Sequence, residues 1–222
     1  MNTLKFFFLI PVILISHSLA AADEPDGNDT LYVPSVKLGL DVSGFARKLV
    51  EPETLTAELS VDYEWQEYFF GVVEAGMLTV DVEKQSHTYQ TEGRFIRAGV
   101  DINIFKPSGH SSQEGVFVTG RYGYGTLEQR APYILIHDPF WGDYETSIES
   151  DRYQAHWLEA GIGLKTELWR NIFLGWSLRG RLLLGGTSDP DMEPYFISGF
   201  GKNGGSAAIM LHYSIYYRVP FR

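Results

Sequence analysis

The sequence has no cysteine, too few basic residues to balance its acidic ones, and only one long apolar run, at its start. Without cysteine, the chain forms no disulfide and has no thiolate chemistry. Its 18 Lys and Arg against 28 Asp and Glu give a net charge of −10, which argues against a nucleic-acid partner because phosphates require a basic surface. Beyond the first run, no stretch reaches about 18 apolar residues, so we predict no transmembrane helix.

The N-terminus has the pattern of a secretory signal peptide. Lys5 is followed by the apolar run Phe6–Ile15 and by small residues at 18–22, which is the order of charge, apolar core and cleavage region in such peptides. The run is shorter than the ~20 apolar residues that span a bilayer. We therefore predict a cleaved signal peptide over residues 1–22, a flexible acidic leader over 23–33, and one exported domain over 34–222.

Alternating apolar and polar residues dominate this domain. Such a period of two indicates β-strands, and short and long connections alternate between them, as in bacterial outer-membrane barrels. The segment 194–202 resembles a ninth strand, but single-chain bacterial barrels have even strand numbers, so we assign it to the last outer loop. The predicted fold is an all-β, closed, antiparallel, up-and-down transmembrane barrel of eight strands, with ten as the alternative. Its strands are 34–43, 55–63, 68–82, 93–105, 115–126, 153–168, 172–185 and 206–218.

One of these strands changes its pattern. In 68–82 the apolar residues are odd-numbered up to Met77 and even-numbered from Leu78 on. A β-bulge inserts one residue and reverses the facing of all that follow. We therefore predict a bulge near Gly76.

Strand length and aromatic placement favour a membrane barrel over a soluble one. Several strands reach 12 to 16 residues, whereas soluble strands are usually about 5–6 residues long. The aromatic residues are expected in two girdles at the membrane interfaces, although β-sheets are rich in aromatics generally. The inner girdle is predicted from Trp65, Tyr68, Phe69, Phe105, Trp169, Phe173, Tyr217 and Phe221, and the outer one from Tyr122, Tyr124, Tyr153 and Trp157.

The polar parity carries charges of both signs in nearly equal number. An eight-stranded barrel is about filled by its own side chains, and unpaired buried charges cost several kcal/mol each. We therefore predict a plugged, salt-bridged interior, the alternative being charges that face water on a soluble sheet. The set comprises Lys37, Asp41, Glu58, Asp62, Glu74, Arg97, Asp101, Arg121, Glu159, Lys165, Glu167, Arg179 and Arg181, with His212 as an inward-facing histidine.

Several segments resemble a known family. They are APYILIHDPFWGDYETSI at 131–148, HWLEA at 156–160, GWSLRG at 175–180 and the closing YYRVPFR at 216–222. They resemble a family of small exported β-barrel proteins classed as a domain of unknown function. The resemblance implies an outer-membrane location and carries no activity or catalytic residue.

The third outer loop holds the richest set of candidate binding residues. Its aromatics favour contact with a protein or glycan, its acids and histidine would suit a divalent cation, and a packed cap over the barrel is the plain structural alternative. The loop matches no metal motif, so we predict no metal and no cofactor. The candidates are Tyr133, His137, Asp138, Phe140, Trp141, Asp143, Tyr144 and Glu145.

These patterns favour a structural or surface-interaction role in the bacterial outer membrane, with membrane lipids as partners. One alternative is a lipid-active enzyme at the outer rim, using residues among His137, His156, Ser147, Glu149 and Ser150. Such chemistry requires a serine within hydrogen-bond reach of an oriented histidine, and no GxSxG motif occurs. The other alternative is a small-solute channel.

Overall fold

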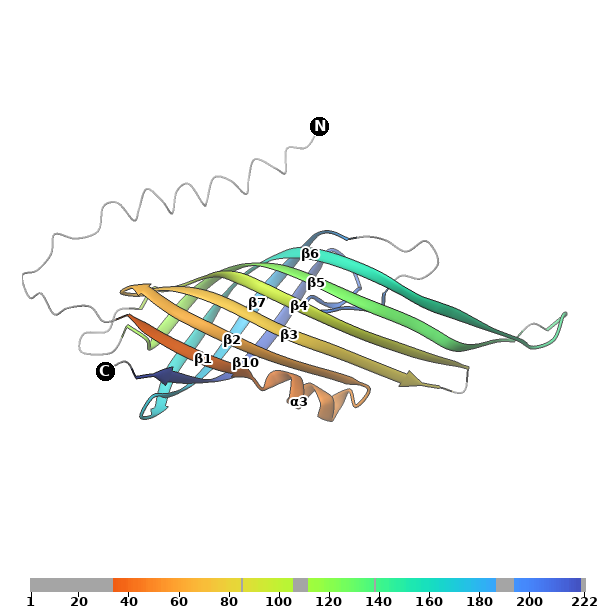
Figure 1. Ribbon diagram of the computed structural model, residues 1–222, viewed down its shortest axis with the longest axis horizontal. Coiled ribbons are helices and arrows are strands. Elements are labelled where there is room, and N and C mark those ends of the chain that lie inside the picture. Colours follow the sequence, from red (N-terminus) through yellow and green to blue (C-terminus); the bar gives the residue numbers. More distant parts are fainter. Residues whose placement is uncertain (1–33, 85, 106–111, 138, 187–193, 221–222) are drawn as a thin grey trace, which may run out of the picture. The chain divides into compact units, whose positions relative to one another are not determined.

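Eight antiparallel strands close into a barrel in the computed structural model of the protein (Figure 1). The structure describes residues 34–84, 86–105, 112–137, 139–186 and 194–220, so the predicted signal peptide, the leader and Phe221 lie outside it. The sheet order β1-β10-β7-β6-β5-β4-β3-β2 confirms the eight-stranded up-and-down barrel. The strands are β1 (Ser35–Asp41), β2 (Thr54–Gln66), β3 (Phe69–Glu83), β4 (His87–Asn103), β5 (Gly115–Ile136), β6 (Tyr144–Trp169), β7 (Ile172–Gly186) and β10 (Ala207–Val219).

The period of two in the sequence places the two kinds of side chain on opposite faces of the sheet. At one level of the barrel, Leu40 lies opposite Leu59 and Ile215, and all three are exposed on the outside. Their polar neighbours along each strand point inward. The outward apolar belt comprises Leu38, Leu40, Leu59, Val61, Val73, Met77, Ile96, Val100, Val118, Tyr122, Tyr124, Leu158, Ile162, Leu174, Trp176, Leu178, Leu211 and Ile215.

One end of the barrel, which we call the turn end, has the two shortest connections between strands. It holds the connections β2–β3, β4–β5 and β6–β7. Tyr68 and Asn171 adopt positive φ values of 69° and 67° in the two shortest turns, a conformation that Asn tolerates better than most side chains. The opposite end, which we call the loop end, holds the other connections.

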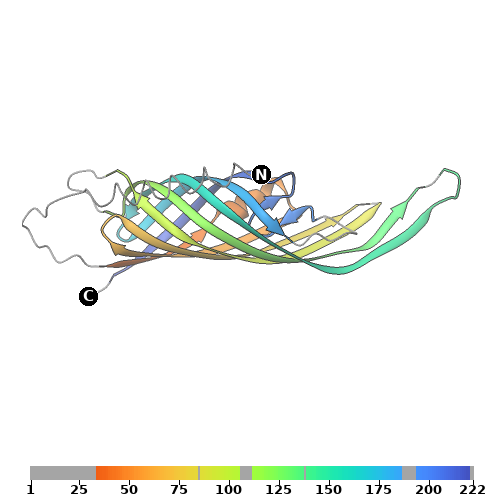
Figure 2. The same ribbon diagram turned by 90° about the horizontal axis from the view of Figure 1, so that it is seen from above.

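The loop end is built largely from strands, contrary to the predicted loops. The predicted loops 83–92 and 127–152 are mostly continuations of β3–β4 and β5–β6, and the β5–β6 hairpin is the most extended (Figures 1 and 2). The sequence still alternates there, but polar side chains replace the apolar ones on the outside. Glu128 and Arg130 point outward while Leu127 and Gln129 are buried.

The same change from apolar to polar side chains on the outside explains the sequence pattern of β3. The bulge predicted near Gly76 is wrong. Pairing of β3 with both neighbouring strands runs through Gly76 without a register shift. The apolar parity changes because Leu78, Val80 and Val82 point inward and pack with Phe196. Thr79, Asp81 and Glu83 face outward beyond the belt.

Two further elements occupy the loop end. A helix, α3 (Ser43–Val50), follows the short strand β1 and contacts β2 and β10. A Cβ at Gly44 would collide with the Thr56 carbonyl oxygen, so glycine allows this close approach. The segment 194–202 forms a small hairpin, β8 (Phe196–Ile197) with β9 (Gly201–Lys202), whose strands are not paired with those of the barrel sheet.

The predicted aromatic girdles are partly wrong. Trp65, Phe105, Trp169 and Tyr217 are exposed near the turn end, and Tyr122 and Tyr124 are exposed higher up. Phe173, Tyr153 and Trp157 are instead buried, because they occupy the inward parity of their strands. Within the described residues, no helix has the length and apolar content needed to cross a membrane.

Candidate functional site: the charged barrel interior

Arg97 lies at the centre of the barrel interior and is fully buried. Its guanidinium forms ion pairs with Glu74 at 2.8 Å, Glu159 at 3.2 Å and Glu58. These carboxylates come from β3, β6 and β2, so one side chain on β4 ties four strands together across the interior. Its planar group, with five N–H donors, suits such multiple pairing.

Further ion pairs extend from this centre toward the turn end. Arg121 pairs with Glu74 at 3.1 Å and with Asp101 at 2.9 Å. Asp101 also accepts from Lys165 Nζ at 2.9 Å, and Lys165 reaches Asp62 at 2.6 Å. The structure thus links Arg97 to Asp62 through an unbroken series of contacts.

Another branch runs toward the loop end. Arg179 pairs with Glu74 at 2.9 Å, and Arg181 pairs with Glu159 at 2.9 Å. The indole Nε1 of Trp157 donates to the same Glu159 oxygen at 2.7 Å. In all, Arg97, Arg121, Lys165, Arg179 and Arg181 meet an equal number of carboxylates, those of Glu58, Asp62, Glu74, Asp101 and Glu159.

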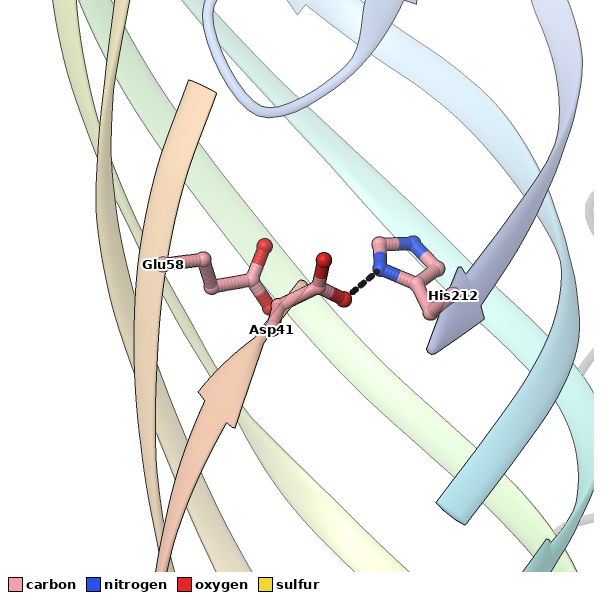
Figure 3. A group of neighbouring side chains, drawn as sticks. All are labelled: Asp41, Glu58 and His212. Atoms are coloured by element: carbon pink, nitrogen blue, oxygen red, sulfur yellow. Dashed lines mark hydrogen bonds and ion pairs between the residues drawn. The ribbon is translucent and has the colours of Figure 1, made fainter. Parts of the chain in front are cut away.

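Asp41, Glu58 and His212 gather where β1 ends (Figure 3). His212 Nε2 lies 2.8 Å from an Arg181 nitrogen. Because an arginine does not act as an acceptor, Nε2 must accept, and Nδ1 therefore carries the proton that it donates to Asp41 at 2.9 Å. Asp41 also accepts from Ser43.

This arrangement bears on metal binding. The three side chains bring carboxylate and imidazole atoms within 4.8 Å of one another. A metal on Nδ1 would need that nitrogen deprotonated, and Nε2 would then carry a proton facing the Arg181 N–H. The contacts therefore favour a hydrogen-bonded cluster over a metal centre while Arg181 stays in place.

Besides Asp41, two predicted members of the interior set, Lys37 and Glu167, stand apart from the ion pairs around Arg97. Lys37 is fully buried, with Nζ 4.8 Å from the Phe70 ring centroid and 5.0 Å from that of Phe173. Glu167 is half-buried at the turn end, where it accepts from the Asn171 backbone N–H at 2.8 Å. Lys37 thus has cation–π contacts, and Glu167 stabilises a turn.

Polar residues absent from the predicted set fill the turn end. Glu64 is buried and accepts from Ser35 at 2.9 Å, from Gln113 at 2.8 Å and from Ser112 at 2.6 Å. The end of the β4–β5 connection is thereby tied across the barrel to β1 and β2. Glu64 has the inward parity of β2, and this pattern in the sequence could have placed it in the predicted interior set.

An apolar cluster fills the interior toward the loop end. Ile197 and Phe200 of the β8–β9 segment pack against Phe95 and Trp157. Arg181 donates to the Phe200 carbonyl oxygen at 2.8 Å. Within the segment 194–202, which the sequence assigned to the last outer loop, Phe196–Phe200 are therefore mostly buried.

A salt bridge joins the two elements at the loop end. Lys202 Nζ lies 2.9 Å from Glu51. This hydrogen bond with the Glu51 carboxylate raises the pKa of the Lys202 ammonium. The pair connects the β8–β9 segment to the residue that follows α3.

The structure places the outer-loop candidates on the extended β5–β6 hairpin. Tyr133 lies on β5, and Tyr144 and Glu145 lie on β6. Phe140 and Trp141, at the tip, are 92% and 91% exposed. His137 Nδ1 lies 2.7 Å from Asp143, while Asp138 lies outside the described residues.

The rim histidines show no catalytic arrangement. His156 faces outward, with Nδ1 3.2 Å from the Tyr122 hydroxyl. Among the described side chains, no serine is hydrogen-bonded to a histidine that a carboxylate orients. The side chain of Ser150 lies outside this description.

Together these features define a class: a small closed β-barrel with apolar side chains outside and paired charges inside. The chain belongs to the family named Domain of unknown function (DUF6048), whose model matches residues 3–222. Among curated proteins, no relative matches this sequence.

Solved structures with detectable similarity are known. The attachment invasion locus protein Ail of Yersinia pestis is 11% identical, with a TM-score of 0.45, over 84% of this chain and 97% of that one. A major outer membrane protein from Thermus thermophilus is 14% identical, with a TM-score of 0.45, over 84% and 98%. Neisserial surface protein A is 11% identical, with a TM-score of 0.30, over 85% and 96%.

Proposed function

We propose that this protein is a bacterial outer-membrane β-barrel with a sealed interior, exported by a cleaved signal peptide. The observation that carries the proposal is the continuous outward apolar belt. Large exposed apolar surfaces are rare on soluble proteins, whereas lipid requires them. A closed barrel also satisfies every ladder hydrogen bond, as spanning a bilayer demands.

The interior supports a sealed barrel rather than a channel. Ion pairs cross its centre, Glu64 and its partners fill the turn end, and Phe200 with its neighbours fills the loop end. Purified protein in planar bilayers should therefore show no stable conductance. A reproducible single-channel current would contradict the sealed interior and restore the channel alternative.

The membrane location has a direct test. Detergent-extracted membranes should yield a protein that migrates faster on gels when unboiled than when boiled, because the folded barrel resists the gel detergent. Recovery of the protein in the soluble fraction without detergent would refute the proposal. Mass spectrometry of the extracted protein should also show an N-terminus near residue 23.

We further propose that the β5–β6 hairpin contacts a protein or glycan. Phe140 and Trp141 are large aromatic side chains at its tip, and such residues are enriched at binding hot spots. The F140A/W141A variant should keep its heat-modifiable migration and lose the binding that the wild type shows on a glycan or protein array. A wild-type binding profile in this variant would count against the hairpin as the contact surface.

A further inference from the structure

A polar groove lies on the outward face of the barrel, directly beyond the apolar belt. Its volume is about 750 Å³, and side chains of β3, β4, β5 and β6 line it. Most of these side chains have the outward parity. The groove therefore opens to the surroundings of the barrel and not to its interior.

The strand register places the groove at the edge of the belt. Ile96 lies opposite Tyr124, and both are apolar and exposed. Two residues further along β4, Arg94 lies between Met77 and Thr126. Because a strand rises about 3.3 Å per residue, Arg94 lies ~7 Å along β4 from Ile96, at the edge of the belt that Met77 closes on β3. A lipid whose acyl chains lie against the belt would have its headgroup at this level.

The guanidinium of Arg94 is available to bind a ligand in this groove. Its cross-strand neighbours, Met77 and Thr126, are uncharged, and within the described part of the chain the Arg94 guanidinium makes no hydrogen bond or ion pair. Arg130, by contrast, donates to Gln90 at 2.8 Å. An exposed arginine with free donors suits the bidentate binding of a phosphate.

The acids of the groove limit which phosphate compounds fit. Glu92 on β4 lies directly opposite Glu128 on β5, and like charges in this position repel. The lining carries the acids Asp81, Glu92 and Glu128 and the arginines Arg94, Arg130 and Arg152, so it offers partners of both signs. A ligand that brings hydroxyl or amine donors toward these carboxylates, together with a phosphate for Arg94, satisfies both.

We propose that this groove binds the phosphorylated sugar headgroup of an outer-leaflet lipid, with Arg94 on its phosphate and Glu92 and Glu128 on its hydroxyl or amine groups. The inference rests on the proposed membrane location, because the belt edge at Ile96 and Tyr124 is what positions the headgroup. It adds a ligand class and a site to that function.

The test uses full-length protein in detergent micelles, with diphosphoryl lipid A as the probe and native mass spectrometry as the readout. The variant is Arg94→Gln. Its matched control is Arg170→Gln, an exposed arginine in the β6–β7 turn at the opposite end. A charge-assisted hydrogen bond contributes enough that its loss should weaken lipid A binding about tenfold or more, with Arg170→Gln unchanged.

Two further arms identify the source of the phosphate. Dephosphorylated lipid A should bind wild type about as weakly as lipid A binds Arg94→Gln, and millimolar inorganic phosphate should not displace lipid A. Equal binding by wild type and Arg94→Gln, an equal loss in Arg170→Gln, or displacement by inorganic phosphate would each overturn the proposal. Heat-modifiable migration of every variant separates such a failure from a failure of the membrane location.

Discussion

Removing the Arg97 charge should destabilise the barrel more than any substitution of an exposed residue. Arg97 is 0% exposed and pairs with Glu58, Glu74 and Glu159. Breaking one buried ion pair by removing a partner costs about 3–5 kcal/mol, because it leaves an uncompensated charge. Arg97→Gln would leave three carboxylates short of a partner, so we expect a loss at the upper end of that range, about 5 kcal/mol.

The assay is urea-induced unfolding of the barrel refolded into lipid vesicles, followed by tryptophan fluorescence. Trp157 donates to Glu159 and therefore reports on the same cluster. Arg170→Gln, at an exposed turn position, is the control and should stay within about 0.5 kcal/mol of wild type. The double variant R97Q/E58Q restores the balance of charge and should recover at least about 1 kcal/mol of the loss.

The reasoning would be refuted by an Arg97→Gln loss below about 1 kcal/mol, the range of exposed ion pairs. Such a result would mean that water reaches the cluster and screens it. It would equally be refuted if R97Q/E58Q were no more stable than R97Q alone, because charge balance would then not explain the effect.

Three further substitutions test the packing of the loop end by the same unfolding assay. Phe200→Ala should cost about 3–5 kcal/mol by leaving a cavity against Trp157; a loss under about 1 kcal/mol would show that the β8–β9 segment does not pack there. Gly44→Ala should cost about 1–3 kcal/mol, because its Cβ would meet the Thr56 carbonyl oxygen, and an unchanged midpoint would argue against the close approach of α3. Lys202→Ala should change stability by less than about 1 kcal/mol, since its pair with Glu51 is largely exposed; a larger loss would assign that pair a structural role.

The sequence predicted the barrel well where each face of a strand keeps one kind of side chain, apolar outside and polar inside. Between Leu55 and Tyr63 or between Ile96 and Ile104, apolar and polar residues alternate without interruption, and the barrel has eight strands in the predicted up-and-down order. The inward placement of residues such as Arg97 and Glu159 follows from the same alternation, because parity alone decides the face.

The loop end was harder because both faces of its strands change chemistry there. At Leu78 the interior becomes apolar while the outside becomes polar, which imitates a bulge in the sequence. Trp157 and Phe173 were assigned to girdles by residue type, although their parity places them inside. The contacts of Phe196–Phe200 with the interior depend on the folded barrel, and no local pattern in the segment indicates them.

The claim on which everything else depends is that the apolar parity faces lipid and the charged parity faces inward. Trp176 is 40% exposed on the outside and Trp157 is 0% exposed on the inside, so two single-tryptophan variants measure it directly. In vesicles of lipids brominated along their acyl chains, fluorescence from the Trp176 variant should be strongly quenched and that from the Trp157 variant should not. Stronger quenching of Trp157 than of Trp176 would contradict the account.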